Sequence, residues 1–136
     1  MRYEVTTVFK GVHHIGYLTD DVQAARKFFA DNFDGQVLRE STSPEGNKAL
    51  FMQMGEVEVE IIEPADRSKL GGKKGLVIEH VGFLVEDLEG AKAGLEKKGV
   101  KFESAAPAAG GTRPRISYME TASALGTRIH LSRMQA

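Results

Sequence analysis

The chain has 136 residues, of which 41% are hydrophobic and 27% charged, and this composition is that of a single globular domain over residues 1–136. Its net charge of -1 gives no reason to expect nucleic acid or an anionic membrane as a partner, and the lack of cysteine excludes disulfides, a thiol nucleophile and a zinc–thiolate site. Because no apolar run reaches the length of a membrane span and the N-terminus lacks a signal-peptide pattern, we expect a cytoplasmic protein.

The first half of the chain carries strand, helix and turn signals in a clear order. Residues 1–10 are either an additional edge strand or a lead-in, and the sequence leaves both open. The elements predicted after them are a strand over 12–19, a helix that Asp20 or Asp21 caps and Asp34-Gly35 ends, and strands over 37–40, 48–54 and 56–62. Gly55 permits a hairpin between the last two strands. A polar, glycine-rich linker follows over about 65–76.

The second half repeats this order. Its predicted elements are a strand over 78–85, a helix that Asp87 caps and Gly99 ends, and strands over 100–103, 115–120 and 127–133, with a glycine-containing loop over 105–114. Each half is therefore a βαβββ unit.

Both halves open on the same ten-residue stretch. Residues 12–21 (VHHIGYLTDD) align without gaps with residues 78–87 (IEHVGFLVED), so that His14 matches His80 and a glycine follows each histidine by two positions. The sequence therefore predicts two tandem modules, about 12–64 and 77–133. One module cannot bury both faces of its sheet, so we expect an α+β fold in which the modules form a concave mixed sheet with helices on the outer face.

Side-chain alternation along the strands divides the residues between the two faces of that sheet. The apolar residues expected under the helices are Ile15, Tyr17, Val57, Val59, Ile61, Val81, Phe83, Ile129 and Leu131. The opposite, concave face then carries His14, Glu58, Glu60, His80 and His130. The candidate ligands among them are His14, Glu60, His80 and His130. Imidazole and carboxylate are the ligands of Zn, Ni, Co, Fe or Mn. With one ligand from the first and one from the last strand of each module, we predict one divalent metal ion held by these four residues.

Structural roles compete with this prediction. A single strand histidine more often serves packing, and an acidic strand containing Glu58 and Glu60 is often simply solvated. The prediction therefore depends on the coincidence of all four positions. Gly16 and Gly82, two residues past the repeated histidines, either leave room for a ligand beside the metal or mark a local bend.

These features resemble the vicinal oxygen chelate superfamily, which includes glyoxalase I, methylmalonyl-CoA epimerase, extradiol dioxygenases and the bleomycin and fosfomycin resistance proteins. The resemblance covers about residues 12–134 and is carried by His14-Ile15-Gly16, Glu60 to Pro64, His80 to Leu88, Gly110 to Arg113 and Gly126 to Leu131. It implies paired βαβββ modules, a metal on the four predicted ligands, a small-molecule substrate and a homodimer.

Two positions depart from the pattern of the glyoxalases and epimerases. Their last-strand ligand is a glutamate that also takes part in proton transfer, whereas this chain has His130 there. The second carboxylate base of the epimerase aligns with Ala49. We therefore expect Glu60 or His130 to move the proton as the catalytic residue, or Glu58 or Tyr118 to do so from beside the metal.

Two arginines near the penultimate strand are candidates for substrate contact. Arg113 and Arg115 offer guanidinium forks for a phosphate or carboxylate tail, with solvated loop charges as the alternative interpretation. Tyr118 is a third candidate substrate contact.

The sequence favours an enzyme of the lyase, isomerase or epimerase type. A divalent metal would hold the oxygens of a small carbonyl or thioester compound and stabilise an enolate. A non-haem iron dioxygenase and a metal-free binding or resistance protein are the alternatives.

Overall fold

Seven strands and two α-helices account for most of the residues that the computed structural model describes, 8–103 and 116–133. The strands are β1 (Phe9–Thr19), β2 (Gln36–Thr42), β3 (Lys48–Met54), β4 (Val57–Glu63), β5 (Leu76–Val85), β6 (Ile116–Tyr118) and β7 (Ile129–Arg133). The helices are α1 (Val22–Phe33) and α2 (Leu88–Lys97), with 3-10 helices η1 (Arg67–Leu70) and η3 (Thr121–Ala124). The chain divides into two units, residues 14–80 and residues 1–13 with 81–136. We call them the first and the second unit. That both belong to one domain stays a prediction.

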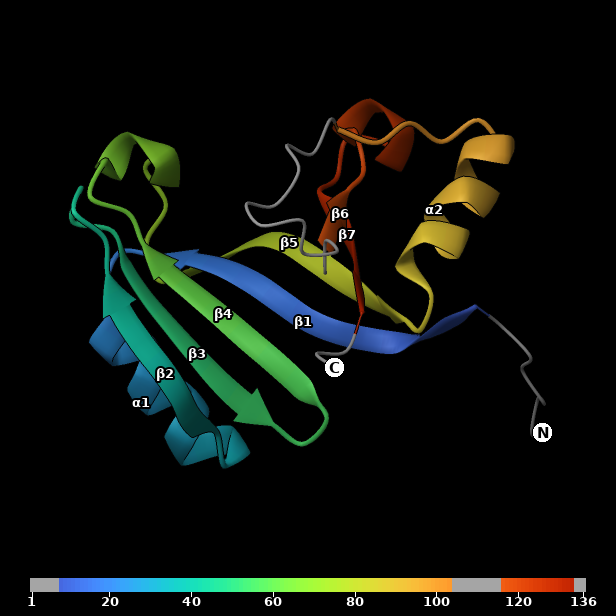
Figure 1. Ribbon diagram of the computed structural model, residues 1–136. Helices are drawn as coiled ribbons and strands as arrows, with labels where there is room; N and C mark the ends of the chain where they lie inside the picture. Colours follow the sequence, from blue (N-terminus) through green and yellow to red (C-terminus); the bar gives the residue numbers. More distant parts are fainter. Residues whose placement is uncertain (1–7, 104–115, 134–136) are drawn as a thin grey trace. The chain divides into compact units, whose positions relative to one another are not determined.

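The first unit is a mixed four-stranded sheet in the order β2-β3-β4-β1. β1 runs parallel to β4, and the other two pairs are antiparallel. α1 packs on one face of β3 and β4 (Figure 1). The core between helix and sheet consists of Val22, Ala25, Phe29, Leu50, Met52, Val59 and Ile61, with Tyr17 packed against it.

Local sequence signals explain the ends of α1. The Asp21 carboxylate accepts hydrogen bonds from the backbone N–H groups of Gln23 and Ala24, which confirms one of the two predicted caps. Glu63, buried at the end of β4, accepts from the Val22 N–H at 2.8 Å. A long-range carboxylate therefore satisfies a helix N–H that the local sequence does not. Asp34, with a φ of 55°, ends the helix as predicted.

The second unit contains the strand order β5-β7-β6, with β5 parallel to β7 and β6 antiparallel to it. α2 begins after Asp87, whose carboxylate accepts from Gly90 N–H. Its core of Val85, Leu88, Ala91 and Leu131 is extended by Phe9, Phe83, Leu95 and Phe102. Phe9 belongs to β1, so at least the end of the N-terminal segment left open by the sequence is strand.

The predicted α+β class, with two modules of strands and one helix each, is confirmed. Of the apolar residues expected under the helices, Val59, Ile61 and Leu131 are fully buried, and Tyr17 and Phe83 pack against the two cores. The strand predicted over 100–103 is wrong in extent, because only a single bridge between Phe102 and Met119 forms. The predicted linker contains η1, which the Asp66 carboxylate caps.

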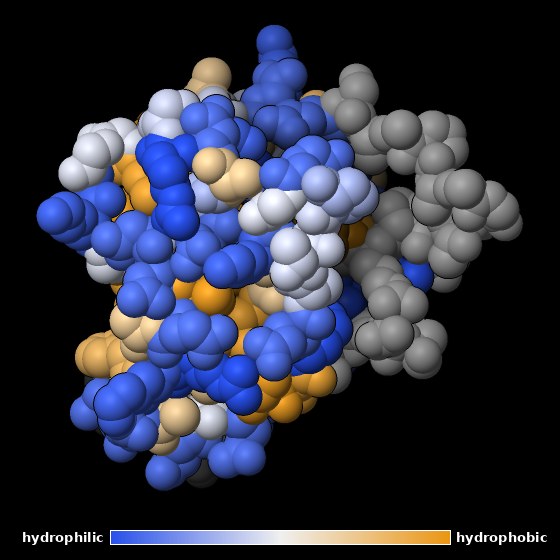
Figure 2. All heavy atoms as spheres, turned by 90° about the vertical axis from the view of Figure 1, so that its left-hand side faces the viewer, coloured by the Kyte–Doolittle hydropathy of each residue, from blue (hydrophilic) through white to orange (hydrophobic). Residues whose placement is uncertain are grey.

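The surface of the first unit is polar but interrupted by apolar side chains. Seen from the side of α1 and β2, orange patches lie among blue side chains (Figure 2). The exposed large apolar residues of these two elements are Phe28, Phe33, Val37 and Leu38. Among the described helices, none has the length and apolar character that crossing a membrane requires.

Candidate metal centre

Strand register sets the candidate ligands of the first unit on one face. His14 on β1 is the partner of Glu58 on β4, and Gly16 is the partner of Glu60. Because paired residues point to the same side of a sheet, these four share a face. The buried residues Val59 and Ile61 alternate with them, so this face is the one away from α1. We call it the open face.

His80, the last residue of the first unit, brings a second imidazole to this group. Its Nε2 lies 3.7 Å from a Glu60 carboxylate oxygen. Its ring centroid lies 5.1 Å from that of His14, with an edge-to-face angle of 73°. Both histidines are buried, with exposed fractions of 4% for His14 and 8% for His80. His14, Glu60 and His80 are therefore brought together; we call them the histidine–carboxylate cluster.

The absence of a side chain at Gly16 leaves room for the imidazole ring of His80. A Cβ atom built at Gly16 would lie 2.5 Å from His80 Nε2, and closer still to Cε1 and Nδ1. Real side chains do not approach this closely, so the imidazole occupies the space that the missing side chain leaves. The sequence predicted room for a bound ligand beside Gly16; the structure places the ring of His80 itself there.

Glu79 holds the other side of the His80 ring. Its carboxylate contacts His80 Nδ1. A carboxylate on Nδ1 favours the tautomer that carries its proton on that nitrogen, which leaves Nε2, the atom facing Glu60, as the electron-pair donor. Strand alternation does not predict a role for Glu79, because it assigns the neighbours of His80 to the opposite face. Its adjacency to a predicted ligand was the only signal.

The pKa of His80 is raised above its ordinary value. Burial has the largest single influence and lowers it, but the contacts and negative charges of Glu60 and Glu79 raise it by more in total. The same two carboxylates that favour the imidazolium would equally attract a metal cation.

The donor types of the histidine–carboxylate cluster suit a metal ion, and the spacing of two of its pairs can be compared with that of metal ligands. Ligand atoms about 2.1 Å from a tetrahedral ion are about 3.4 Å apart, close to the 3.7 Å between His80 Nε2 and the Glu60 oxygen. Two imidazoles on one such ion have centroids about 5.2 Å apart, close to the 5.1 Å between His14 and His80. Two histidines and one carboxylate on these elements therefore suit a borderline divalent metal.

The fourth predicted ligand, His130, lies on β7 in the second unit. It is the register partner of Gly82, just as Glu60 is the partner of Gly16 in the first unit. Tyr118, a predicted substrate contact, is also its register partner and packs edge-on against it with ring centroids 4.3 Å apart. The two units therefore repeat the same pairing of a glycine with a candidate last-strand ligand.

The remaining predicted residues are placed as follows. Arg113 and Arg115 lie outside the described residues. Glu58, one candidate for a base, forms an ion pair with Arg39 at 3.3 Å. The β3 residues that share the open face with Glu60 are Ala49, Phe51 and Gln53, so β3 brings no carboxylate to it.

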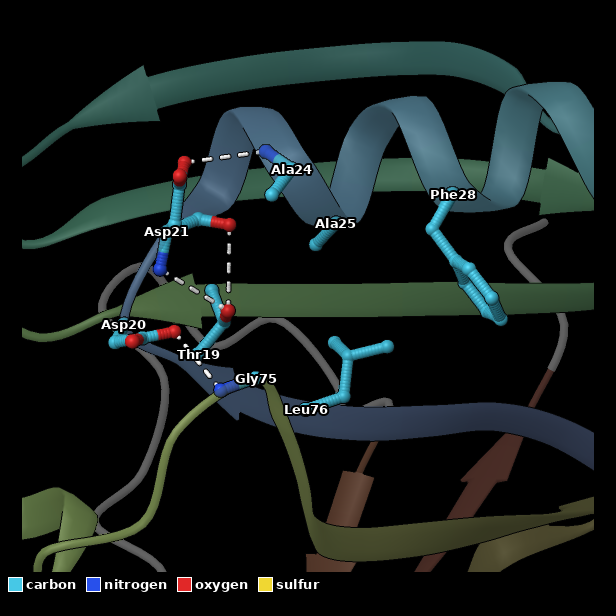
Figure 3. A pocket seen from close by; sticks show the side chains of 8 residues that line it. All are labelled: Thr19, Asp20, Asp21, Ala24, Ala25, Phe28, Gly75 and Leu76. Atoms are coloured by element: carbon cyan, nitrogen blue, oxygen red, sulfur yellow. Dashed lines mark hydrogen bonds between the residues drawn. The ribbon is translucent and has the colours of Figure 1, made fainter.

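A pocket of about 220 Å³ lies away from the cluster, at the start of α1 (Figure 3). Its lining residues are Thr19, Asp20, Asp21, Ala24, Ala25, Phe28, Gly75 and Leu76. The Asp21 carboxylate accepts a hydrogen bond from Ala24 N–H, and the Asp20 carboxylate accepts one from Gly75 N–H (Figure 3). Both acidic side chains of the pocket therefore bind backbone N–H groups. The pocket contains none of the predicted ligands.

The fold consists of two strand-and-helix modules, and the first carries imidazole and carboxylate on the sheet face away from its helix. The sequence comparison agrees: residues 13–118 match the model of the Glyoxalase/Bleomycin resistance protein/Dioxygenase superfamily. The chain belongs to this superfamily, and the resemblance stated from the sequence is confirmed. No curated protein sequence matches the chain significantly.

Solved structures with the same fold include several methylmalonyl-CoA epimerases. The enzyme from Mycobacterium tuberculosis is 20% identical with a TM-score of 0.78, over 98% of this chain and 94% of that one. A second methylmalonyl-CoA epimerase structure is 21% identical with a TM-score of 0.75, over 97% and 100%. A variant of the Streptomyces coelicolor enzyme in complex with 2-nitronate-propionyl-CoA is 19% identical with a TM-score of 0.72, over 94% and 99%. At these identities the likeness shows the fold.

Proposed function

We propose that this protein is a divalent-metal-dependent lyase, isomerase or epimerase acting on a small carbonyl or thioester compound. The observation that carries the proposal is the histidine–carboxylate cluster, in which His80 Nε2 and a Glu60 oxygen lie 3.7 Å apart. His14, Glu60 and His80 would hold the ion, and the repeat in the sequence adds His130 as the fourth ligand. When bound by these residues, a Zn, Ni, Co, Mn or Fe ion would supply a Lewis acid for the enolate chemistry proposed here.

The chain itself must then hold and move one proton. Glu60 and His130 are the proposed catalytic residues, because a carboxylate or an imidazole can take a proton from the carbon next to a carbonyl. Glu58 suits this role less well, since its carboxylate is paired with Arg39. β3 of the first unit supplies no carboxylate on the open face. The epimerase has a carboxylate base at the position of Ala49, which this chain lacks. These features therefore support a different proton-transfer group.

One observation favours a second candidate. Two histidines and one carboxylate are also the ligand set of non-haem iron oxygenases. His14, His80 and Glu60 would supply such a set within the first unit, which the proximity of His80 to the other two supports. Iron in the purified protein, together with oxygen consumption, would favour this candidate over enolate chemistry. The metal-free binding protein and the homodimer remain predictions from the sequence and the family.

Elemental analysis of the untagged protein tests the metal. We expect about one divalent ion per chain in the parent and none in the His14→Ala/His80→Ala double variant. His13→Ala is the matched control, because His13 neighbours His14 at the opposite strand parity, and it should keep the ion. No ion in the parent, even after incubation with excess Zn²⁺, Ni²⁺, Co²⁺, Mn²⁺ or Fe²⁺, would refute the proposal.

Deuterium exchange tests the chemistry without knowledge of the product. In D₂O, an enzyme that forms an enolate replaces hydrogen with deuterium at the carbon beside the carbonyl, which NMR detects for each compound of a panel. We expect exchange with the metal-loaded parent and its loss in Glu60→Ala or His130→Ala. Exchange that survives both substitutions while the ion stays bound would assign the proton transfer elsewhere.

A further inference from the structure

Arg39 lies in one cross-strand row with the histidine–carboxylate cluster. It is the register partner of Phe51 on β3, Phe51 is the partner of Glu60 on β4, and Glu60 is the partner of Gly16. Paired residues share a face, so Arg39 lies on the open face of the first unit. Adjacent strands are about 4.8 Å apart, which puts the Cα atoms of Arg39 and Glu60 about 10 Å apart.

A β-bulge in β2 turns Arg39 toward this face. The register shifts between Val37, the partner of Met52, and Arg39, the partner of Phe51. Without the extra residue, Leu38 would face Phe51, and Arg39 would face the buried Leu50 under α1. Bulges re-aim side chains in this way and occur often beside active sites. The bulge therefore moves a cation from the core side of the sheet to the side of the cluster.

Two contacts hold the guanidinium in place. It stacks over the Phe51 ring, with Cζ 3.9 Å from the ring centroid. Its Nη2 lies 3.3 Å from a carboxylate oxygen of Glu58. Glu58 precedes Glu60 by two residues, so both lie on the same face of β4. A guanidinium has five N–H donors, so this contact leaves donors for an oxyanion. A fork fixed in this way loses less side-chain freedom on binding.

The charge of the open face makes this cation distinctive. Among the strand residues of 14–80, Arg39 is the only arginine or lysine with this parity, next to Glu58, Glu60 and the histidines. Arg26, by contrast, pairs with Glu40 at 3.2 Å on the helix side of the same strand. An anionic compound that approaches the cluster across this face meets Arg39.

We propose that Arg39, held over Phe51 and against Glu58, is the binding subsite for an oxyanion, a carboxylate or phosphate group, at the end of the substrate remote from its carbonyl. This inference rests on the proposed function for the reacting end of the substrate. It adds the substrate class: an anionic carbonyl or thioester compound that extends from β4 toward β2.

Probe binding to the metal-stripped protein tests the subsite apart from the metal. Protein passed over a chelating resin is titrated with malonate, with inorganic phosphate and with the neutral malonamide, while NMR follows the Arg39 side-chain Nε–H. We expect malonate or phosphate, but not malonamide, to shift this resonance. Arg39→Ala should weaken the binding about 10- to 100-fold, the range for a hydrogen bond to a charged group. Arg39→Lys should bind with intermediate affinity, because lysine keeps the charge without the fork.

The matched control is Arg26→Ala, which removes the other ion-paired arginine of this sheet and should change binding less than twofold. Binding of malonate alone, or of phosphate alone, would identify the group at the end of the substrate. No binding of either anion to the parent, or equal binding to a folded Arg39→Ala or Arg39→Lys variant, would overturn the inference. If the protein takes up no metal but binds anions through Arg39, the oxyanion subsite is supported and the proposed metal-dependent enzyme is refuted.

Discussion

Substituting Gly16 by alanine tests the packing that positions His80. The new Cβ would lie 2.1 Å from His80 Cε1, the nearest ring atom, whereas ordinary contact begins at 3.4 Å, so the ring must retreat by about 1.3 Å. Metal–nitrogen bonds of about 2.1 Å tolerate deviations of about 0.2 Å. His80 would therefore be lost as a ligand, and we expect metal affinity to fall at least as much as on loss of an outer-shell partner, about 10- to 100-fold.

Competition against a chromophoric chelator measures this affinity, and thermal unfolding of the metal-free protein checks the fold. Gly94→Ala is the control, because a Cβ at this position in α2 meets nothing within 4 Å and should leave metal affinity unchanged. If the clash is with the imidazole, Gly16→Ala should cost nothing further in a His80→Ala background. Parent affinity in the single variant, or additive losses in the double variant, would refute the reasoning.

Three further predictions concern Glu79, Glu63 and Asp66. Glu79→Gln should lower metal affinity about 10- to 100-fold while the His80 ring stays in place, since only the carboxylate on Nδ1 is lost; unchanged affinity by the same competition would contradict its positioning role. Glu63→Ala leaves the Val22 N–H without its acceptor and removes ion pairs to Arg67 and Lys48. The free energy of unfolding, measured in urea, should therefore fall by about 1–3 kcal/mol. The control Glu40→Ala, which removes an exposed ion pair, should lower it by about 0.5 kcal/mol or less. The pKa of Asp66 is lowered by its hydrogen bonds from the Ser68 side chain and backbone, so its contribution to stability is present at neutral pH and disappears as the pH falls through that lowered pKa. An NMR titration should show the pKa of Asp66 rising in Ser68→Ala; no change would argue against the hydrogen bond.

The sequence predicted the parts of the first unit that follow from regular alternation. Period-two strands and an unbroken ten-residue repeat were sufficient to put His14, Gly16 and Glu60 on one face, because a strand without irregularity carries parity along its length. The same rule does not place Arg39, since a bulge shifts parity by one residue and leaves no compositional trace. Nor does it predict the contact of Glu79, whose long side chain reaches His80 although its Cβ belongs to the other face.

The repeat accounts for the scaffold, and divergence between its copies accounts for the chemistry. In both units a repeat glycine is the partner of the last-strand candidate ligand, Gly16 with Glu60 and Gly82 with His130. Duplication alone would give two equal half-sites. Instead, His80 is flanked by the carboxylates Glu60 and Glu79, which raise its pKa, whereas the residue that matches Glu79 in the first copy is His13. The copies therefore differ at this position, since the second has a carboxylate where the first has an imidazole. These two carboxylates would attract a cation to the side of the cluster where His80 lies.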